Sequence, residues 1–352
     1  QAAQKASGNR MSHLTYAEAM VIGLIQGVTE LFPVSSLGHS VLIPALVGGS
    51  WAQDLSVSRP ESPYLAFIVG LHVATAAALI IYFRHDWARI VTGFVSSLRD
   101  RTIATAEQKL AWMIVLATIP VGLAGLALEH TFRVVFSKPV PTALFLAVNG
   151  VILLAGERAR RRSGEHGAAQ QPAMAAPATP QRAMTAAGYP AQSPGRYPAS
   201  PLSGLRQQPV EQSADSPETA EDGRLAGMGF GKAIVIGAVQ VFALLPGISR
   251  DGMVTVTGMF RGLSREDAVR YSFLLSTPVI LAAGVLKIPD LFGPLGAGIH
   301  GQVLAGSLLS GLAAYFSVRF LVRYFSKARS LVPFAIYCLI AGLGSLAWFA
   351  IR

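Results

Sequence analysis

The chain has 352 residues, of which 52% are hydrophobic and only 14% are charged, and its mean hydropathy is +0.46. Soluble globular proteins carry about 25% charged residues. This composition excludes an ordinary soluble enzyme and predicts an α-helical protein with several membrane spans. The formal charge of +10 does not indicate nucleic-acid binding, because the basic residues cluster in loops beside apolar segments, as topological anchors do.

The first half of the chain opens with a broken apolar segment. Residues 1–14 are predicted to be an N-terminal extension without a role in the fold. Tyr16–Val28 and Val41–Val47 are apolar but too short to cross a membrane, and Pro33 lies between them. Proline interrupts a helix. We therefore predict a re-entrant helical hairpin here rather than a crossing.

The remaining apolar segments predict six transmembrane helices. A second broken segment, Phe230–Leu245, is ended by Pro246 and predicts a second re-entrant hairpin. The predicted spans are Tyr64–Phe83, Leu110–Leu128, Thr142–Ala155, Ala268–Leu286, Gln302–Leu321 and Val332–Ile351. The fold class is therefore an all-α polytopic membrane protein with six transmembrane helices and two re-entrant hairpins.

A polar region divides the chain into two halves. Nine of the 21 prolines fall between Pro172 and Pro217, in a stretch rich in Ala, Gln, Ser and Gly. Such a composition cannot bury enough apolar surface to fold. We predict a disordered cytoplasmic linker over 158–227, between a first membrane repeat at 15–157 and a second at 228–352.

The loop charges predict the orientation of the chain. Five lysines and arginines lie in the connection 84–109 and four in 319–329, whereas 129–141 holds two and 287–300 holds one. Lysine and arginine are enriched in cytoplasmic loops. The first two connections are therefore expected on the cytoplasmic side, so that the first hairpin enters from outside and the second from inside.

Opposed hairpins are typical of an inverted repeat, and the two halves resemble each other in sequence. Ala19–Gln26 aligns with Ala233–Gln240, and five of the eight pairs are identical. Short, proline-broken apolar segments in matching positions of two halves indicate a binding site at the repeat interface.

The first broken segment contains polar groups that are expensive at membrane depth and therefore indicate function. Glu30 is suited to act as a general base or to hold a divalent cation, and His39 to transfer a proton. Ser35 and Ser36 are suited to phosphate binding or nucleophilic attack. One of the two serines is also expected to cap the following helix.

The second broken segment resembles an oxyanion site. Arg250 needs a partner at this depth, and its planar guanidinium matches a phosphate or carboxylate. Gly247 and Gly252 allow a ligand to approach the backbone, whose N–H groups bind anions where a helix begins. Together the two segments offer the charge neutralisation and positioning that phosphoryl transfer requires.

The paired motifs identify a family resemblance. Gln26-x-x-x-Glu30 and Pro33-Val-Ser-Ser-x-Gly-His39, followed by Pro246-Gly-x-Ser-Arg250, resemble the bacterial undecaprenyl-diphosphate phosphatases, also called bacitracin-resistance proteins. The similarity extends from about Tyr16 to Trp348, excluding the linker. The resemblance implies an inverted-repeat membrane fold in the bacterial plasma membrane, with the active site facing outward.

The resemblance also implies the reaction and its residues. The expected activity removes the terminal phosphate from undecaprenyl diphosphate, with a divalent cation such as Mg²⁺ or Ca²⁺, and thereby recycles the lipid carrier of cell-wall synthesis and confers resistance to bacitracin. The expected partners are the lipid diphosphate and the membrane, without nucleic acid, and a homodimer is left open. The residues carried over are catalytic Glu30, Ser36, His39 and Arg250; substrate-binding Gln26, Ser35, Gly247, Ser249, Gly252 and Thr255; and metal-binding Glu30, with Asp251 as a second candidate ligand.

Three positions depart from the family pattern. Gln26 replaces a frequent glutamate, Asp251 replaces the second serine of Ser-Arg-Ser, and Val254 replaces a threonine. Asp251 either pairs with Arg250 or restores the carboxylate missing at Gln26, and the second interpretation is slightly favoured.

Other interpretations compete with the catalytic one. A transporter or flippase for a polyprenyl phosphate would use the same architecture, but a carboxylate at Glu30 beside an anion site favours chemistry. His39 is also suited to bonding a backbone carbonyl where the helix breaks. His72, Tyr271, Ser276 and Thr277 are expected to serve helix packing.

Overall fold

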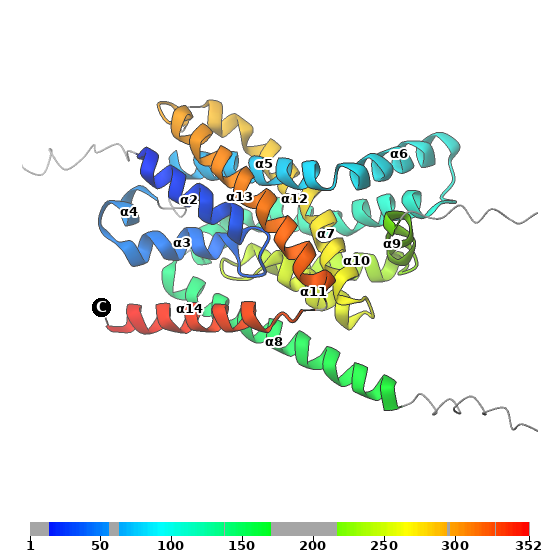
Figure 1. The fold of residues 1–352 in the computed structure, drawn as a ribbon. Helices are drawn as coiled ribbons and strands as arrows, with labels where there is room; N and C mark the ends of the chain where they lie inside the picture. Colours follow the sequence, from blue (N-terminus) through cyan, green and yellow to red (C-terminus); the bar gives the residue numbers. More distant parts are fainter. Residues whose placement is uncertain are drawn as a thin grey trace, which may run out of the picture.

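A computed structural model describes residues 14–55, 63–136, 138–169, 217–293, 296–327 and 329–351. Within these ranges the chain forms helices and no β-strand, which confirms the predicted all-α class (Figure 1). The helices are α2 Tyr16–Thr29, α3 Ser36–Val47, α4 Gly49–Asp54, α5 Pro63–Tyr82, α6 Arg84–Asp100, α7 Ala106–Phe136, α8 Pro139–Ala169, α9 Pro217–Ala226, α10 Phe230–Ala238, the 3₁₀ helix η1 Val239–Leu244, α11 Arg250–Phe260, α12 Arg265–Phe292, α13 His300–Ser326 and α14 Val332–Ile351.

Several of these helices have the length and composition of membrane spans. Among the described residues, α7, α8, α12, α13 and α14 are long and apolar enough to cross a membrane. A sixth span results if α5 and α6, which meet at a bend of 88°, are counted together. Large apolar side chains are exposed on these helices, for example Leu126 on α7 and Ile340 on α14. Outward-facing apolar side chains are what a helix surrounded by lipid requires.

Both broken segments interrupt their helices where the prolines predicted. The helix α2 begins with a capping box made by Thr15 and Glu18, and the chain breaks after Thr29. Helix α3 begins after Ser35, which has a φ of 70°. In the second segment, α10 tightens into η1, and Gly247 then adopts a φ of 111° before α11. Left-handed backbone conformations allow the chain to reverse within few residues.

The packing of the two halves supports the inverted repeat. In the sequence alignment, Gly23 of α2 corresponds to Gly237 of α10. A Cβ atom at Gly23 would overlap the backbone of Gly306 on α13, and one at Gly237 would overlap Ala117 on α7. The pair α2–α13 thus has its counterpart in α10–α7, while α5 packs on α12 and α8 on α14 (Figure 1). Each half therefore packs the first helix of its broken segment against a long helix of the other half.

The structure differs from the sequence prediction at several connections. Helix α8 continues to Ala169 and α9 covers Pro217–Ala226, so both ends of the predicted linker are helical. Alanine, arginine and glutamate favour the helix in the α8 extension. The connections predicted at 84–109, 129–141 and 287–300 are largely occupied by α6 and by the ends of α7, α8 and α12. Residues 1–13 of the predicted N-terminal extension and residues 170–216 of the linker lie outside the described residues. Leu14, the last residue of that extension, is buried and its carbonyl accepts a hydrogen bond from Gln302, so it does take part in the fold.

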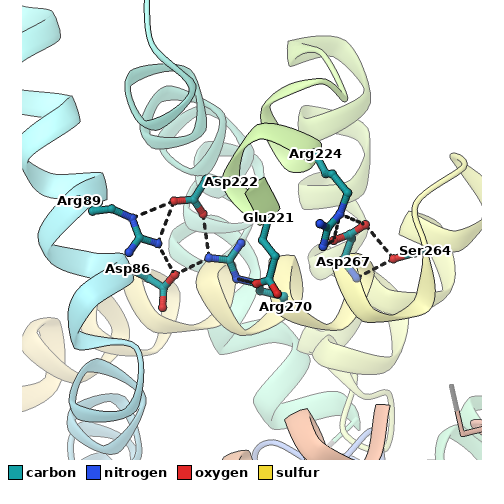
Figure 2. Close-up of polar contacts among 8 residues, drawn as sticks. All are labelled: Asp86, Arg89, Glu221, Asp222, Arg224, Ser264, Asp267 and Arg270. Carbon is teal, nitrogen blue, oxygen red and sulfur yellow. Dashed lines mark hydrogen bonds and ion pairs between the residues drawn. The ribbon is translucent and has the colours of Figure 1, made fainter. Parts of the chain in front are cut away.

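Ion pairs attach α9 to both repeats (Figure 2). Asp222 accepts hydrogen bonds from Arg89 of α6, at 3.0 Å, and from Arg270 of α12, at 2.8 Å. Arg270 also pairs with Asp86 of α6 and lies 3.1 Å from Glu221. Buried charges are stable only when they are paired and hydrogen-bonded. These contacts and the burial of Leu225 explain why α9 is ordered despite its polar composition.

Candidate functional site

The two helix breaks lie in direct contact with each other. The backbone N–H of Gly247 donates to Ser35 Oγ at 3.1 Å. A Cβ atom at Gly38 would lie 3.0 Å from the Cα atom of Gly247. Segments that are 212 residues apart in sequence are thus joined through a side chain of the first break. The sequence prediction that they form one site is consistent with this arrangement.

Asn149 of α8 joins the same two breaks from the side. Its Nδ2 donates to the carbonyl of Pro33 at 3.0 Å, and its Oδ1 accepts from the N–H of Ser249 at 2.9 Å. The side chain is fully buried. Asn149 belongs to neither of the two sequence motifs. An amide inside the predicted span Thr142–Ala155 was the available signal, because polar groups are rare at membrane depth.

A cavity of about 170 Å³ lies between the breaks. Its lining contains polar side chains from both segments and apolar side chains from the surrounding helices. The polar residues are Glu30, Ser35, Ser36, His72, Gln240, Ser249 and Arg250, and the apolar ones are Leu37, Val121, Ala243, Leu244, Ile248, Val279, Ile280 and Ala283. This lining suits a ligand with a charged head and an apolar body.

Glu30 is the centre of the polar part. Its Oε1 accepts a hydrogen bond from Arg250 Nη2 at 2.8 Å. Its Oε2 accepts from Gln26 Nε2 at 2.8 Å and from Ser36 Oγ at 2.5 Å. The carboxylate of the first repeat and the guanidinium of the second therefore meet in the cavity. A hydroxyl bonded to a carboxylate is the arrangement of a nucleophile with its base.

The two histidines take places that differ from the sequence expectation. His72, which was assigned to packing, lines the cavity with Nε2 at 3.6 Å from Glu30 Oε2. His39 is buried, and its two ring nitrogens lie 2.7 Å from the carbonyl of Ser35 and 2.7 Å from the hydroxyl of Tyr337. Because a carbonyl only accepts, Nδ1 of His39 carries the proton and Nε2 accepts from Tyr337. This geometry favours the interpretation of His39 as support for the helix break.

The N–H groups of two glycines that were expected to bind an oxyanion donate to serine side chains of the protein instead. The N–H of Gly247 is bonded to Ser35 Oγ, and the N–H of Gly252 donates to Ser249 Oγ at 3.1 Å. Ser35 and Ser249 act as helix N-caps, and a cap satisfies the N–H groups of the first turn. The prediction that these two N–H groups bind phosphate is therefore not supported. Thr255 is likewise absent from the lining of the main cavity.

Asp251 faces helix α12 rather than the cavity. Its Oδ1 accepts from Ser272 Oγ at 2.8 Å and from Ser276 Oγ at 2.5 Å, and it lies 3.9 Å from Arg250 Nε. The carboxylate is buried behind the guanidinium. Of the two sequence interpretations, the structure favours pairing with Arg250. Ser276, which was expected to pack between helices, holds this carboxylate.

The metal-binding capacity of the cavity is small. Across the described part of the chain, no group of three or more His, Cys, Asp or Glu side chains gathers to hold a metal ion. Glu30 is the single carboxylate among the described lining residues. Magnesium is commonly bound by one or two carboxylates together with substrate phosphates. The residues present therefore fit a cation that shares its coordination with a bound phosphate.

The chain is similar to known proteins over most of its length. The model of the family described as Bacitracin resistance protein BacA matches residues 19–182 and 208–344. A protein of Mycolicibacterium paratuberculosis named Undecaprenyl-diphosphatase is 57% identical over 97% of this chain and 99% of its own length. Undecaprenyl-diphosphatase 2 of Frankia alni is 54% identical over 97% of this chain and 100% of its own length. The chain belongs to the BacA family of bacitracin-resistance proteins.

Proposed function

We propose that the chain hydrolyses undecaprenyl diphosphate to undecaprenyl phosphate and inorganic phosphate. Relatives that match nearly the whole chain carry the name of this activity. The observation that carries the proposal is the contact between Arg250, Glu30 and Ser36 inside a cavity with apolar walls. Recycling of the lipid carrier for cell-wall synthesis, and resistance to bacitracin, would follow from this reaction.

The residues divide into a binding and a reacting group. Arg250 would bind the terminal phosphate through its guanidinium, which matches phosphate geometry better than a point charge does. Ser36 Oγ would attack the terminal phosphorus while its proton passes to Glu30 Oε2, 2.5 Å away. The bond between that phosphorus and the bridging oxygen breaks, and undecaprenyl phosphate leaves with the electron pair. Water then attacks the phosphoserine, which releases inorganic phosphate and restores the hydroxyl.

Several predicted residues would support this chemistry without reacting. Gln26 holds Glu30 Oε2 through its amide nitrogen at 2.8 Å. Ser35 and His39 fix the first helix break, and Ser249 caps α11 directly before Arg250. A site whose groups are held in place needs little reorganisation during the reaction.

A divalent cation, Mg²⁺ or Ca²⁺, is part of the proposal. Glu30 and the phosphate oxygens of the substrate would hold it, and the cation would neutralise charge on the transferring phosphoryl group. Ser36 Oγ lies close enough to Glu30 to contribute a further oxygen. Asp251 faces α12 and is not included in this ligand set.

The apolar wall indicates where the prenyl chain would lie. Val121 comes from α7, Ala243 and Leu244 from η1, and Val279 and Ala283 from α12. These helices would accommodate the first isoprene units while the diphosphate enters the polar end. The apolar wall supports a site inside the membrane, and the lysines and arginines counted in the sequence favour a site that faces outward from the plasma membrane.

The test is release of inorganic phosphate from undecaprenyl diphosphate by the purified protein in detergent, with Mg²⁺ or Ca²⁺ added in parallel reactions. We expect one inorganic phosphate for each undecaprenyl phosphate formed, and loss of the reaction when EDTA is added. Absence of release with either cation would overturn the proposal. Movement of unhydrolysed lipid across proteoliposomes would then assign the chain to the transport class.

A further inference from the structure

Gln240 is a buried glutamine on the wall of the cavity that the proposed mechanism does not use. It lies in η1, where the second broken segment tightens, and its side chain is fully buried. Its Nε2 donates to the carbonyl of Gly237 at 3.1 Å. Its Oε1 is buried, and no described residue donates a hydrogen bond to it. A buried acceptor without a donor is destabilising, because it has lost its hydrogen bonds to water without replacing them.

The polarity of this side chain is fixed by its neighbour. The carbonyl of Gly237 only accepts, so the amide nitrogen of Gln240 must face it and the amide oxygen must face away. Gln26, the residue aligned with Gln240 in the first repeat, has the opposite polarity, since its amide nitrogen donates to Glu30. Of these two aligned glutamines, Gln26 therefore presents its amide nitrogen to Glu30, whereas Gln240 on the cavity wall has its amide oxygen left to accept a hydrogen bond.

The cavity is lined by donors as well as acceptors, but no donor of the described residues is bonded to Gln240 Oε1. Nδ1 of His72 donates to the carbonyl of Ile68 at 2.9 Å, and its Nε2 lies 3.4 Å from Gln26 Nε2. Glu30 adds two carboxylate oxygens, and the hydroxyl of Ser36 already donates to one of them. Arg250 faces a ligand as a cationic donor, and the hydroxyls of Ser35 and Ser249, whose oxygens accept backbone N–H groups, keep their own hydrogens.

The charges of the cavity also favour a ligand that brings its own hydrogen-bond donor. The charge of Arg250 is balanced by Glu30, and Asp251 adds a second carboxylate behind the guanidinium. A fully ionised phosphate brings only acceptors and negative charge, so it would leave Gln240 Oε1 unpaired. A phosphate that keeps one hydrogen brings a donor and one negative charge fewer.

We propose that Gln240 is a substrate-binding residue whose Oε1 accepts a hydrogen bond from the P–OH group of the terminal phosphate, so that the site selects protonated phosphoryl groups. The inference extends the proposed function and rests on it for the identity of the ligand as a phosphate. A site that hydrogen-bonds one hydroxyl rejects ligands that lack it, because its polar atom is then left unpaired.

Phosphate and sulfate test this directly, because at mildly alkaline pH both are tetrahedral dianions and only phosphate carries a hydrogen. Equilibrium binding of radiolabelled phosphate and sulfate to the purified protein, in EDTA and in Mg²⁺, gives their affinity ratio. We expect the wild type to prefer phosphate by about tenfold or more, with or without the cation. Gln240→Leu should bring the ratio near unity by weakening phosphate binding.

Gln302→Leu is the matched control. Gln302 Nε2 also donates to a backbone carbonyl at 3.1 Å, that of Leu14, but the residue lies outside the cavity lining. The control should keep the wild-type ratio. Equal binding of the two anions by the wild type, or an unchanged ratio in Gln240→Leu, would overturn the inference. If the wild type prefers phosphate only when Mg²⁺ is present, Gln240 Oε1 binds the cation rather than the P–OH group, and the inference is overturned as well. Because binding is measured without turnover, these outcomes are independent of whether the protein hydrolyses the lipid.

Discussion

Arg250→Ala is expected to lower kcat/KM for phosphate release by about 10³-fold or more, the range found when an arginine that stabilises a transferring phosphoryl group is removed. In the structure this guanidinium is the cationic group in contact with Glu30 in the cavity, at 2.8 Å. Arg250→Lys keeps the charge but loses the planar fork, so we expect an intermediate loss. Rates are measured as inorganic phosphate released from undecaprenyl diphosphate.

The control for Arg250 is Arg261→Ala, at the opposite end of the same helix α11, where the side chain is exposed. It should retain wild-type activity and thermal stability. If Arg250→Ala keeps more than about half of the wild-type activity, the guanidinium does not bind the transferring group, given the size of the effect expected for such a contact.

Gly237→Ala is expected to lower the free energy of unfolding by about 1–3 kcal/mol, the usual effect of overpacking a core. A Cβ atom at this position would overlap the backbone of Ala117, so α10 and α7 would have to separate. Because η1 and Gln240 follow directly, the same shift should reduce activity. The measurement is thermal unfolding of the purified variant in detergent.

Gly231→Ala provides the comparison within α10. Apart from its chain neighbours and the backbone of its own helix, no atom of the described residues lies within 4 Å of a Cβ built at Gly231, so alanine should be neutral or stabilise the helix by up to about 1 kcal/mol. Equal unfolding temperatures for the two variants would show that the close α10–α7 contact does not determine stability.

The sequence predicted the helix breaks and the pairing of the two motifs because local chemistry determines both. Pro33 and Pro246 end helices through the lost N–H and the bulk of the ring. Glu30 and Arg250 are conspicuous because ionisable groups at membrane depth need partners, and each proved to be the partner of the other. The repeat alignment pairs Gly23 with Gly237, and in the structure both lie at close helix contacts.

The remaining features depend on contacts between distant segments. Asn149 bridges Pro33 and Ser249 only once α8 packs beside both breaks. The N–H groups of Gly247 and Gly252 could not be assigned from sequence, since the serines that occupy them belong to caps formed in the fold. Sequence alone did not show that His72 rather than His39 lines the cavity, because helix orientation decides which ring faces it.

The most direct test of the central claim is a structure of the protein with a diphosphate analogue in which a methylene group replaces the bridging oxygen. We predict that the terminal phosphonate lies against Arg250 and Ser36, and that the distance between Arg250 Nη2 and Glu30 Oε1 increases from 2.8 Å. A phosphonate bound elsewhere, with the ion pair between the two repeats intact, would contradict the account.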